Sequence, residues 1–110
     1  MNCHLPNSVE LERTAKMFNA LGDPARLKLL IHLRQGEHCV NELAELENAK
    51  IGTISARLKI LFESNLVKKR RDEKYICYSL ADQHVALLLD TMLAHANECI
   101  SATHKESHYE

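Results

Sequence analysis

The spacing of apolar residues changes along this chain, and that change restricts the fold more than any other feature of the sequence. Up to Asn65, apolar residues recur every three or four positions, which is the helical period. Beyond Asn65 the period changes to two, with Tyr75, Cys77 and Ser79 alternating against Ile76, Tyr78 and Leu80, which is typical of strands. The helical period then returns. The sequence therefore predicts a mainly α fold with a β-hairpin inserted before a final helix.

Capping signals divide the first part of the chain into helices. Asn7 and Glu10 have the spacing of a capping box, and Asp23-Pro24 is typical of an N-cap followed by the first helical residue. We expect helices over residues 8–21, from Pro24 to a stop at Gly36, over a short segment from Val40 to Leu46, and from about Ile51 onward.

The predicted fourth helix has two unlike faces. Its apolar stripe consists of Ile51, Ile54, Leu58 and Leu61. The opposite face is small and polar, as a helix must be to lie deep in the major groove of DNA. The residues best placed to contact bases are Thr53, Ser55 and Lys59, with Arg57 on the flank.

The predicted hairpin has strands over residues 66–71 and 74–80 and a turn at Asp72-Glu73. The window from Arg57 to Lys74 carries a net charge of +4, although the whole chain has a net charge of -1. Such a basic segment attracts phosphates over a long range. We expect the hairpin to contact the DNA backbone through Lys68, Lys69, Arg70, Arg71 and Lys74.

This order of elements predicts one winged helix-turn-helix domain over residues 1–110, with a flexible arm at 1–7 and a frayed tail at 101–110. With 110 residues, the chain builds one core and no deep active site, so we expect neither an enzyme nor a small-molecule substrate. No run approaches the apolar length of a membrane span, and the first residues do not resemble a leader. We expect a cytoplasmic protein.

The final helix, predicted from Asp82 to about residue 100, carries the pattern D-x-H-x10-H-x2-E. Its members Asp82, His84, His95 and Glu98 offer the imidazole and carboxylate ligands that zinc accepts. Eleven residues place the two histidines on nearly the same face but ~16 Å apart along the axis. One chain cannot close this site, whereas two antiparallel copies of the helix would form two sites.

An apolar seam between these two sites favours a homodimer. Leu88 and Thr91 lie on the same predicted face as the histidines, with Leu87 and Met92 beside it. A dimer built on the terminal helices would also space two recognition helices for successive major grooves.

Cysteine and acidic residues predict a secondary metal site. Cys39 and Glu42 share one face of the short third helix, and Cys3 and His4 lie on an arm that could reach them. The four cysteines are far apart in the sequence, which favours reduced thiols over a disulfide framework. Cys77 and Cys99 are expected to be packing residues.

Three segments, ALGDPARLKLL (20–30), EHCVNELA (37–44) and ISARLKIL (54–61), and the D-x-H-x10-H-x2-E pattern resemble the ArsR/SmtB family of metal-responsive bacterial repressors. The resemblance extends from about Phe18 to Ile100. It implies a homodimeric repressor of a metal-homeostasis gene that binds double-stranded operator DNA when metal-free and releases it when zinc binds. The same ligands also accept cobalt, nickel or cadmium.

Other functions fit the same fold. A thiol-based redox or persulfide sensor would use Cys39 with Cys3 or Cys99 in place of the histidines. A small metalloenzyme would keep an open position on its zinc, but no general base or substrate pocket is evident. A dimeric DNA-binding protein without an effector is the third alternative.

Overall fold

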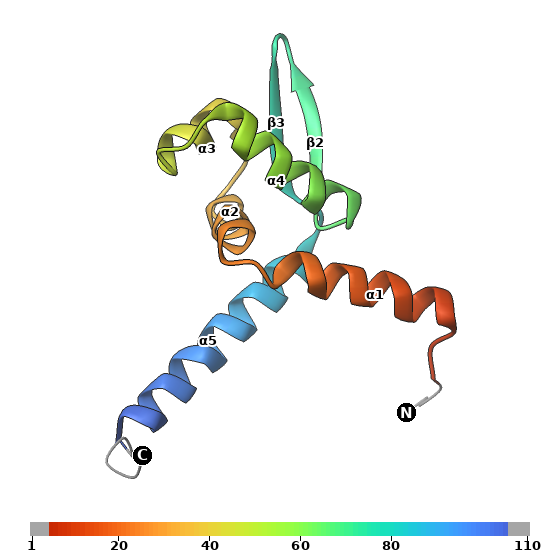
Figure 1. The fold of residues 1–110 in the computed structure, drawn as a ribbon, viewed down its shortest axis with the longest axis vertical. Helices are drawn as coiled ribbons and strands as arrows, with labels where there is room; N and C mark the ends of the chain where they lie inside the picture. The colour runs from red at the N-terminus through yellow and green to blue at the C-terminus, as the bar shows by residue number, and fades with distance from the viewer. Residues whose placement is uncertain (1–4, 106–110) are drawn as a thin grey trace.

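The computed structural model describes residues 5–105, with side chains described as far as Glu98. The elements in chain order are α1 (Ser8–Leu21), α2 (Pro24–Arg34), β1 (His38–Cys39), α3 (Val40–Leu46), α4 (Ile51–Glu63), β2 (Val67–Asp72), β3 (Tyr75–Leu80) and α5 (Gln83–Lys105). Figure 1 shows β2 and β3 projecting beyond the helices, while α1 and α5 extend from the body in two other directions. This is the predicted arrangement of a winged helix-turn-helix domain.

Local side-chain hydrogen bonds begin the helices where the sequence predicts. The Glu10 amide donates to Asn7 Oδ1 (2.8 Å), and the Asn7 amide donates to Glu10 Oε1 (2.9 Å), which completes the capping box of α1. The Arg26 amide donates to Asp23 Oδ2 (3.0 Å) at the start of α2. These bonds satisfy amides that have no partner within the helix.

The core lies where α2, α3 and α4 meet. Its largest fully buried side chains are Leu29, Leu30, Leu43, Ile54, Leu58 and Leu61. Three members of the predicted α4 stripe are therefore buried, but Ile51 is 57% exposed. Ile51 is the first residue of α4 and precedes the point at which the helix reaches the core, so its assignment to the buried stripe was wrong.

The sheet has three strands, in the antiparallel order β1-β3-β2. The hairpin pairs Val67 with Leu80 and Asp72 with Tyr75, so its turn is Glu73-Lys74, one residue later than predicted. The strand β1 was not predicted, because a two-residue strand has no recognisable alternation. It pairs His38 with Tyr78 and Cys39 with Cys77, and so attaches the start of α3 to the hairpin.

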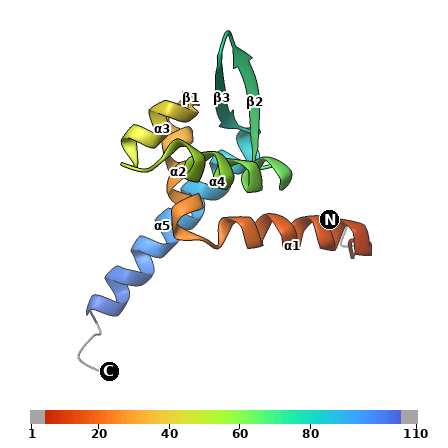
Figure 2. The same ribbon diagram turned by 45° about the horizontal axis from the view of Figure 1, so that its top comes forward.

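The helix α5 contacts the core through its first turns only, where Val85 and Leu89 are buried. It continues to Lys105 rather than ending near Ile100, so residues 101–105 of the predicted tail are helical. Figure 2 shows its C-terminal half extending away from the rest of the domain. Within residues 5–105, no helix has the combination of length and apolar character needed to cross a membrane.

Candidate functional site

The outward face of α4 presents the residues that the sequence selects for base contact. Thr53, Ser55 and Lys59 are exposed, and Arg57 is half-buried. Their direction is fixed because Ile54 and the other apolar residues of α4 are anchored in the core on the opposite side. The helix α3 packs directly against α4, as the first helix of a helix-turn-helix does.

The hairpin of β2 and β3, which forms the wing, carries exposed cations along β2 and at its turn. Arg71 donates from Nε to the Glu73 carbonyl (3.0 Å), and the Lys74 ammonium lies 5.5 Å from the centroid of the Tyr75 ring. Both positive charges remain at the surface, since neither contact neutralises them. Both side chains are therefore accessible from solvent, and their contact with DNA phosphates stays a prediction.

Arg70 differs from the other basic residues of the wing because it is paired with a carboxylate. Its Nε and Nη2 donate to the two carboxylate oxygens of Glu37, at 2.7 Å and 2.8 Å. The hydrogen bond from Arg70 lowers the pKa of Glu37, so the carboxyl stays ionised. Sequence reasoning missed Glu37, which lies 33 residues away and is brought close only by the pairing of β1 with the hairpin.

At the start of α5, Asp82 and His84 lie together. Asp82 Oδ1 accepts from the backbone amides of His84 (2.9 Å) and Val85 (3.3 Å), and it lies 3.4 Å from His84 Nδ1. Desolvation raises the pKa of Asp82, but the hydrogen bonds from Val85 and His84 together outweigh it and lower the pKa below its usual value. The result is an ionised carboxylate beside an imidazole that is 94% exposed.

The other predicted ligands on α5, His95 and Glu98, are exposed toward its C-terminal end. Among the described residues of one chain, no three His, Cys, Asp or Glu side chains are grouped closely enough to hold a metal ion. The four predicted ligands are thus divided into two pairs at opposite ends of one helix segment.

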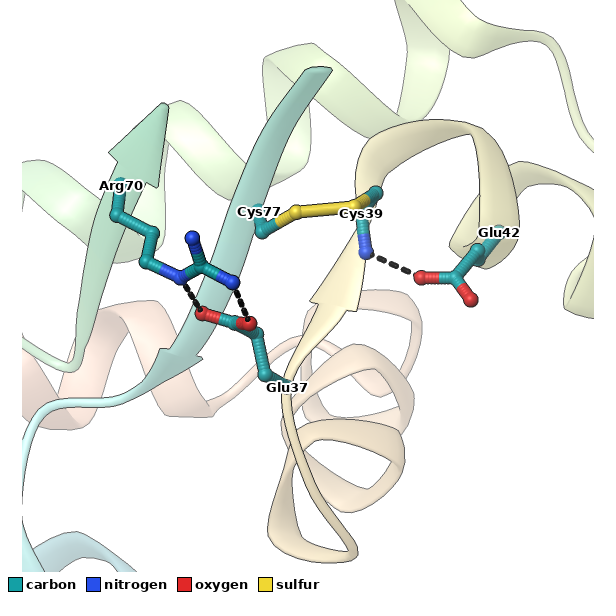
Figure 3. A network of polar contacts seen from close by, with 5 residues as sticks. All are labelled: Glu37, Cys39, Glu42, Arg70 and Cys77. Atoms are coloured by element: carbon teal, nitrogen blue, oxygen red, sulfur yellow. Dashed lines mark hydrogen bonds and ion pairs between the residues drawn. A yellow bond between two sulfur atoms is a disulfide. The ribbon is translucent and has the colours of Figure 1, made fainter. Parts of the chain in front are cut away.

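Figure 3 shows the surroundings of Cys39, which corrects the prediction of reduced thiols. Cys39 and Cys77 form a disulfide, 38 residues apart in the sequence, because β1 places them opposite each other on adjacent strands. Cys77 is thus a bonded partner as well as a buried residue. Glu42 Oε1 accepts from the Cys39 amide (2.7 Å). Cys3 and His4, the remaining residues of the secondary metal site, lie outside the described residues.

An apolar groove runs between the end of α1 and α5. Its lining residues include Phe18, Leu21, Leu27, Leu88, Met92 and Leu93. Phe18 and Met92 are each more than half exposed, at 58% and 52%. Large apolar side chains exposed in one patch are typical of an interface.

Comparisons with known proteins agree with this architecture. Residues 23–69, from α2 into the wing, match the model of the bacterial regulatory protein, arsR family. The chain is 38% identical over 89 residues to the transcriptional repressor SmtB homolog of Synechocystis sp., covering 81% of this chain and 67% of that protein. It is 38% identical over 84 residues to the HTH-type transcriptional regulator NmtR of Mycobacterium tuberculosis, covering 76% of this chain and 70% of NmtR. The matches span about two thirds of the length of these relatives.

Solved structures give the same result. The homodimeric winged helix-turn-helix DNA-binding domain of Mb0332 from Mycobacterium bovis superposes with a TM-score of 0.80 and 30% identity, covering 89% of this chain and 92% of that one. The solution structure of apo-NmtR has a TM-score of 0.71 and 34% identity, covering 88% and 82%. The anchored α4 face, the basic wing and these relatives place this chain in the ArsR/SmtB family of bacterial transcriptional regulators, which are DNA-binding proteins and not enzymes.

Proposed function

We propose that this protein is a cytoplasmic, metal-responsive transcriptional repressor that binds operator DNA as a homodimer. The observation that carries the DNA-binding part is the exposed face of α4, held outward by the buried Ile54, Leu58 and Leu61, next to a basic wing. Thr53, Ser55 and Lys59 would contact base edges in the major groove, and Arg71 and Lys74 would contact phosphates. The repressor named SmtB homolog among its relatives supports the sign of the regulation.

Dimerisation is supported by the apolar groove between α1 and α5. A monomer would leave Phe18, Leu87 and Met92 in water, at 58%, 66% and 52% exposure. Packing a second copy against them would remove this apolar surface from water, at about 25 cal/mol for each Å² buried. A two-fold axis would then bring two copies of α4 to the same face of the dimer.

Metal sensing is assigned to the two pairs of ligands on α5. Asp82 and His84 are an ionised carboxylate and an exposed imidazole at one end, and this donor set fits zinc. In an antiparallel pair of α5 helices, His95 and Glu98 of the second copy would supply the other two ligands. Each site would then contain residues from both chains, so metal binding favours one relative orientation of the two subunits.

A change in the relative orientation of the two subunits needs only a modest free energy. Allosteric couplings are typically about 1–3 kcal/mol per effector, and two identical sites would lower operator affinity by orders of magnitude. Zinc is the proposed effector, and cobalt, nickel and cadmium are the competing ions to be compared with it.

The test is fluorescence anisotropy of the reduced protein on DNA from upstream of its own gene, at fixed salt, first with chelator and then with stoichiometric zinc. We expect tight binding in chelator that is lost with zinc. His84→Ala and His95→Ala should bind DNA equally well but ignore zinc, whereas the control Asn97→Ala on the same helix should respond normally. If zinc releases the two histidine variants from DNA at the concentration that releases wild type, the α5 site is overturned.

The DNA surface is tested in the same assay without metal. Lys59→Ala should weaken binding, while Lys16→Ala, which removes an equal charge from the exposed surface of α1, should not. Equal losses for both variants would show that net charge alone drives binding and would contradict the assigned face.

A further inference from the structure

Three residues lie in one row across the sheet. Arg70 on β2 and Cys39 on β1 are both register partners of Cys77 on β3, between them. Directly opposed residues of antiparallel strands have side chains on the same face. The Cys39–Cys77 disulfide and the Arg70 guanidinium therefore lie on one face, as Figure 3 shows.

The ion pair of Arg70 connects the same two parts of the chain as the disulfide. Glu37 precedes β1 by one residue, and its carboxylate receives both hydrogen bonds from Arg70. The segment 37–39 is thus joined to the hairpin by one covalent bond and one bidentate ion pair (Figure 3).

The covalent bond is the stronger of these attachments. Without it, the segment is held by the backbone pairing of the two β1 residues and by the Glu37–Arg70 ion pair, both of which can dissociate. The disulfide keeps Glu37 at a high effective concentration beside Arg70, so that the carboxylate competes with any phosphate for the same guanidinium. The Arg70 side chain remains 57% exposed, so a phosphate can approach it when Glu37 withdraws.

The redox environment indicates that the Cys39–Cys77 disulfide is regulatory. A transcriptional regulator works where thiols are kept reduced, and disulfides found there are usually transient and redox-sensing. Cys39 is partly exposed, whereas Cys77 is 3% exposed. A reagent in solution therefore reaches Cys39 first.

We propose that Cys39 and Cys77 form a redox latch, closed by a low-molecular-weight disulfide, that withholds Arg70 from the DNA backbone. This inference rests on the DNA-binding part of the proposed function and is independent of the metal site. The Cys39 thiolate attacks the reagent, forms a mixed disulfide and releases one thiol. Cys77 then loses its proton, attacks the Cys39 sulfur and releases the second thiol. Two protein thiols are oxidised to one disulfide, and one reagent disulfide is reduced to two thiols.

The experiment compares metal-free protein treated with oxidised glutathione against protein treated with a phosphine reductant. Mass spectrometry should show the loss of two hydrogen atoms on oxidation. A stable glutathione adduct instead would overturn the latch. In the anisotropy assay the oxidised dimer should bind about tenfold more weakly. Its salt dependence should also be shallower, by about 0.9 in log–log slope for each phosphate contact that is lost.

Variants separate the latch from a general effect of oxidation. Glu37→Gln keeps both cysteines but loses the ionised partner of Arg70, so its DNA affinity should be high in both redox states. Cys39→Ser should remain in the high-affinity state under oxidant, and Cys99→Ser should respond as wild type does. Equal affinity of oxidised and reduced wild type, or a redox effect that persists in Glu37→Gln, would overturn the proposal.

A measurement without DNA keeps this test separate from the proposed function. The NMR signal of the Arg70 Nε proton should show the Glu37 pair in oxidised protein and move to its Glu37→Gln position on reduction. An unchanged signal would overturn the latch whether or not the protein binds DNA. A latch that operates by NMR in a protein that binds no DNA in any redox state would instead overturn the proposed function.

Discussion

Arg34 and Asp90 join α2 to α5 through two parallel hydrogen bonds, Nε to Oδ1 at 3.0 Å and Nη2 to Oδ2 at 2.8 Å. The helix α2 packs against α4, the proposed recognition helix, and α5 carries the proposed metal ligands. This ion pair is therefore a direct link between the helix that would respond to metal and the body that positions α4.

Removing this link should weaken the coupling between metal and DNA. In Asp90→Asn, we expect DNA affinity in chelator and zinc affinity to stay near wild type, while the ratio of DNA affinities with and without zinc decreases. Paired anisotropy and zinc titrations measure both quantities. The control is Glu12→Gln, the same type of change on the exposed surface of α1. An unchanged ratio in Asp90→Asn would mean that coupling passes through other contacts.

The same pair predicts a pH dependence of stability. The hydrogen bond from Arg34 lowers the pKa of Asp90 below its usual value of 3.8. The pKa of Asp90 is lower in the folded protein than in the unfolded chain. Between these two pKa values the unfolded chain binds more protons, so the free energy of unfolding rises with pH. The contribution is complete above the unfolded pKa and is lost as pH falls through the folded pKa. In urea unfolding, wild type should therefore have a higher free energy of unfolding than Asp90→Asn at pH 7, and the difference should disappear in strong acid.

The wing turn contains a strained residue. Glu73 has a φ of 57°, in the left-handed region that costs a non-glycine residue about 1–2 kcal/mol. Glu73→Gly removes this cost but adds unfolded-state entropy, so we expect a net gain of about 0.5 kcal/mol in the free energy of unfolding. Glu73→Ala removes the same carboxylate and keeps the strain, so it should show no gain. Equal stabilisation by both variants, measured by urea unfolding, would assign the effect to charge.

The dimer interface can be tested with two residues of similar exposure. Met92 on α5 is 52% exposed within the apolar groove, and Leu46 on α3 is 54% exposed away from it. Met92→Glu should shift the protein toward monomer in sedimentation velocity, because dimerisation would bury an unpaired charge. Leu46→Glu should leave the dimer intact. A dimer that survives Met92→Glu and dissociates in Leu46→Glu would relocate the interface to α3.

Local interactions made much of this fold predictable. The capping box of Asn7 and Glu10 and the N-cap at Asp23 act over three residues, so the starts of α1 and α2 follow from the sequence. The exposed face of α4 follows from helical periodicity, since burial of Ile54 and Leu58 directs Thr53 and Ser55 outward. The position of Ile51 was wrong because periodicity gives the direction of a side chain but not where along the helix the core begins.

Tertiary structure alone decided the contacts of the sheet. The helices, the hairpin, the basic wing and the spacing of the proposed ligands on α5 follow from the sequence, because each depends on residues close together in the chain. The sequence did not determine that Cys39 meets Cys77 or that Glu37 holds Arg70, since these pairs are 38 and 33 residues apart. Both depend on β1, whose two residues have no period to recognise and are held as a strand only by pairing with β3.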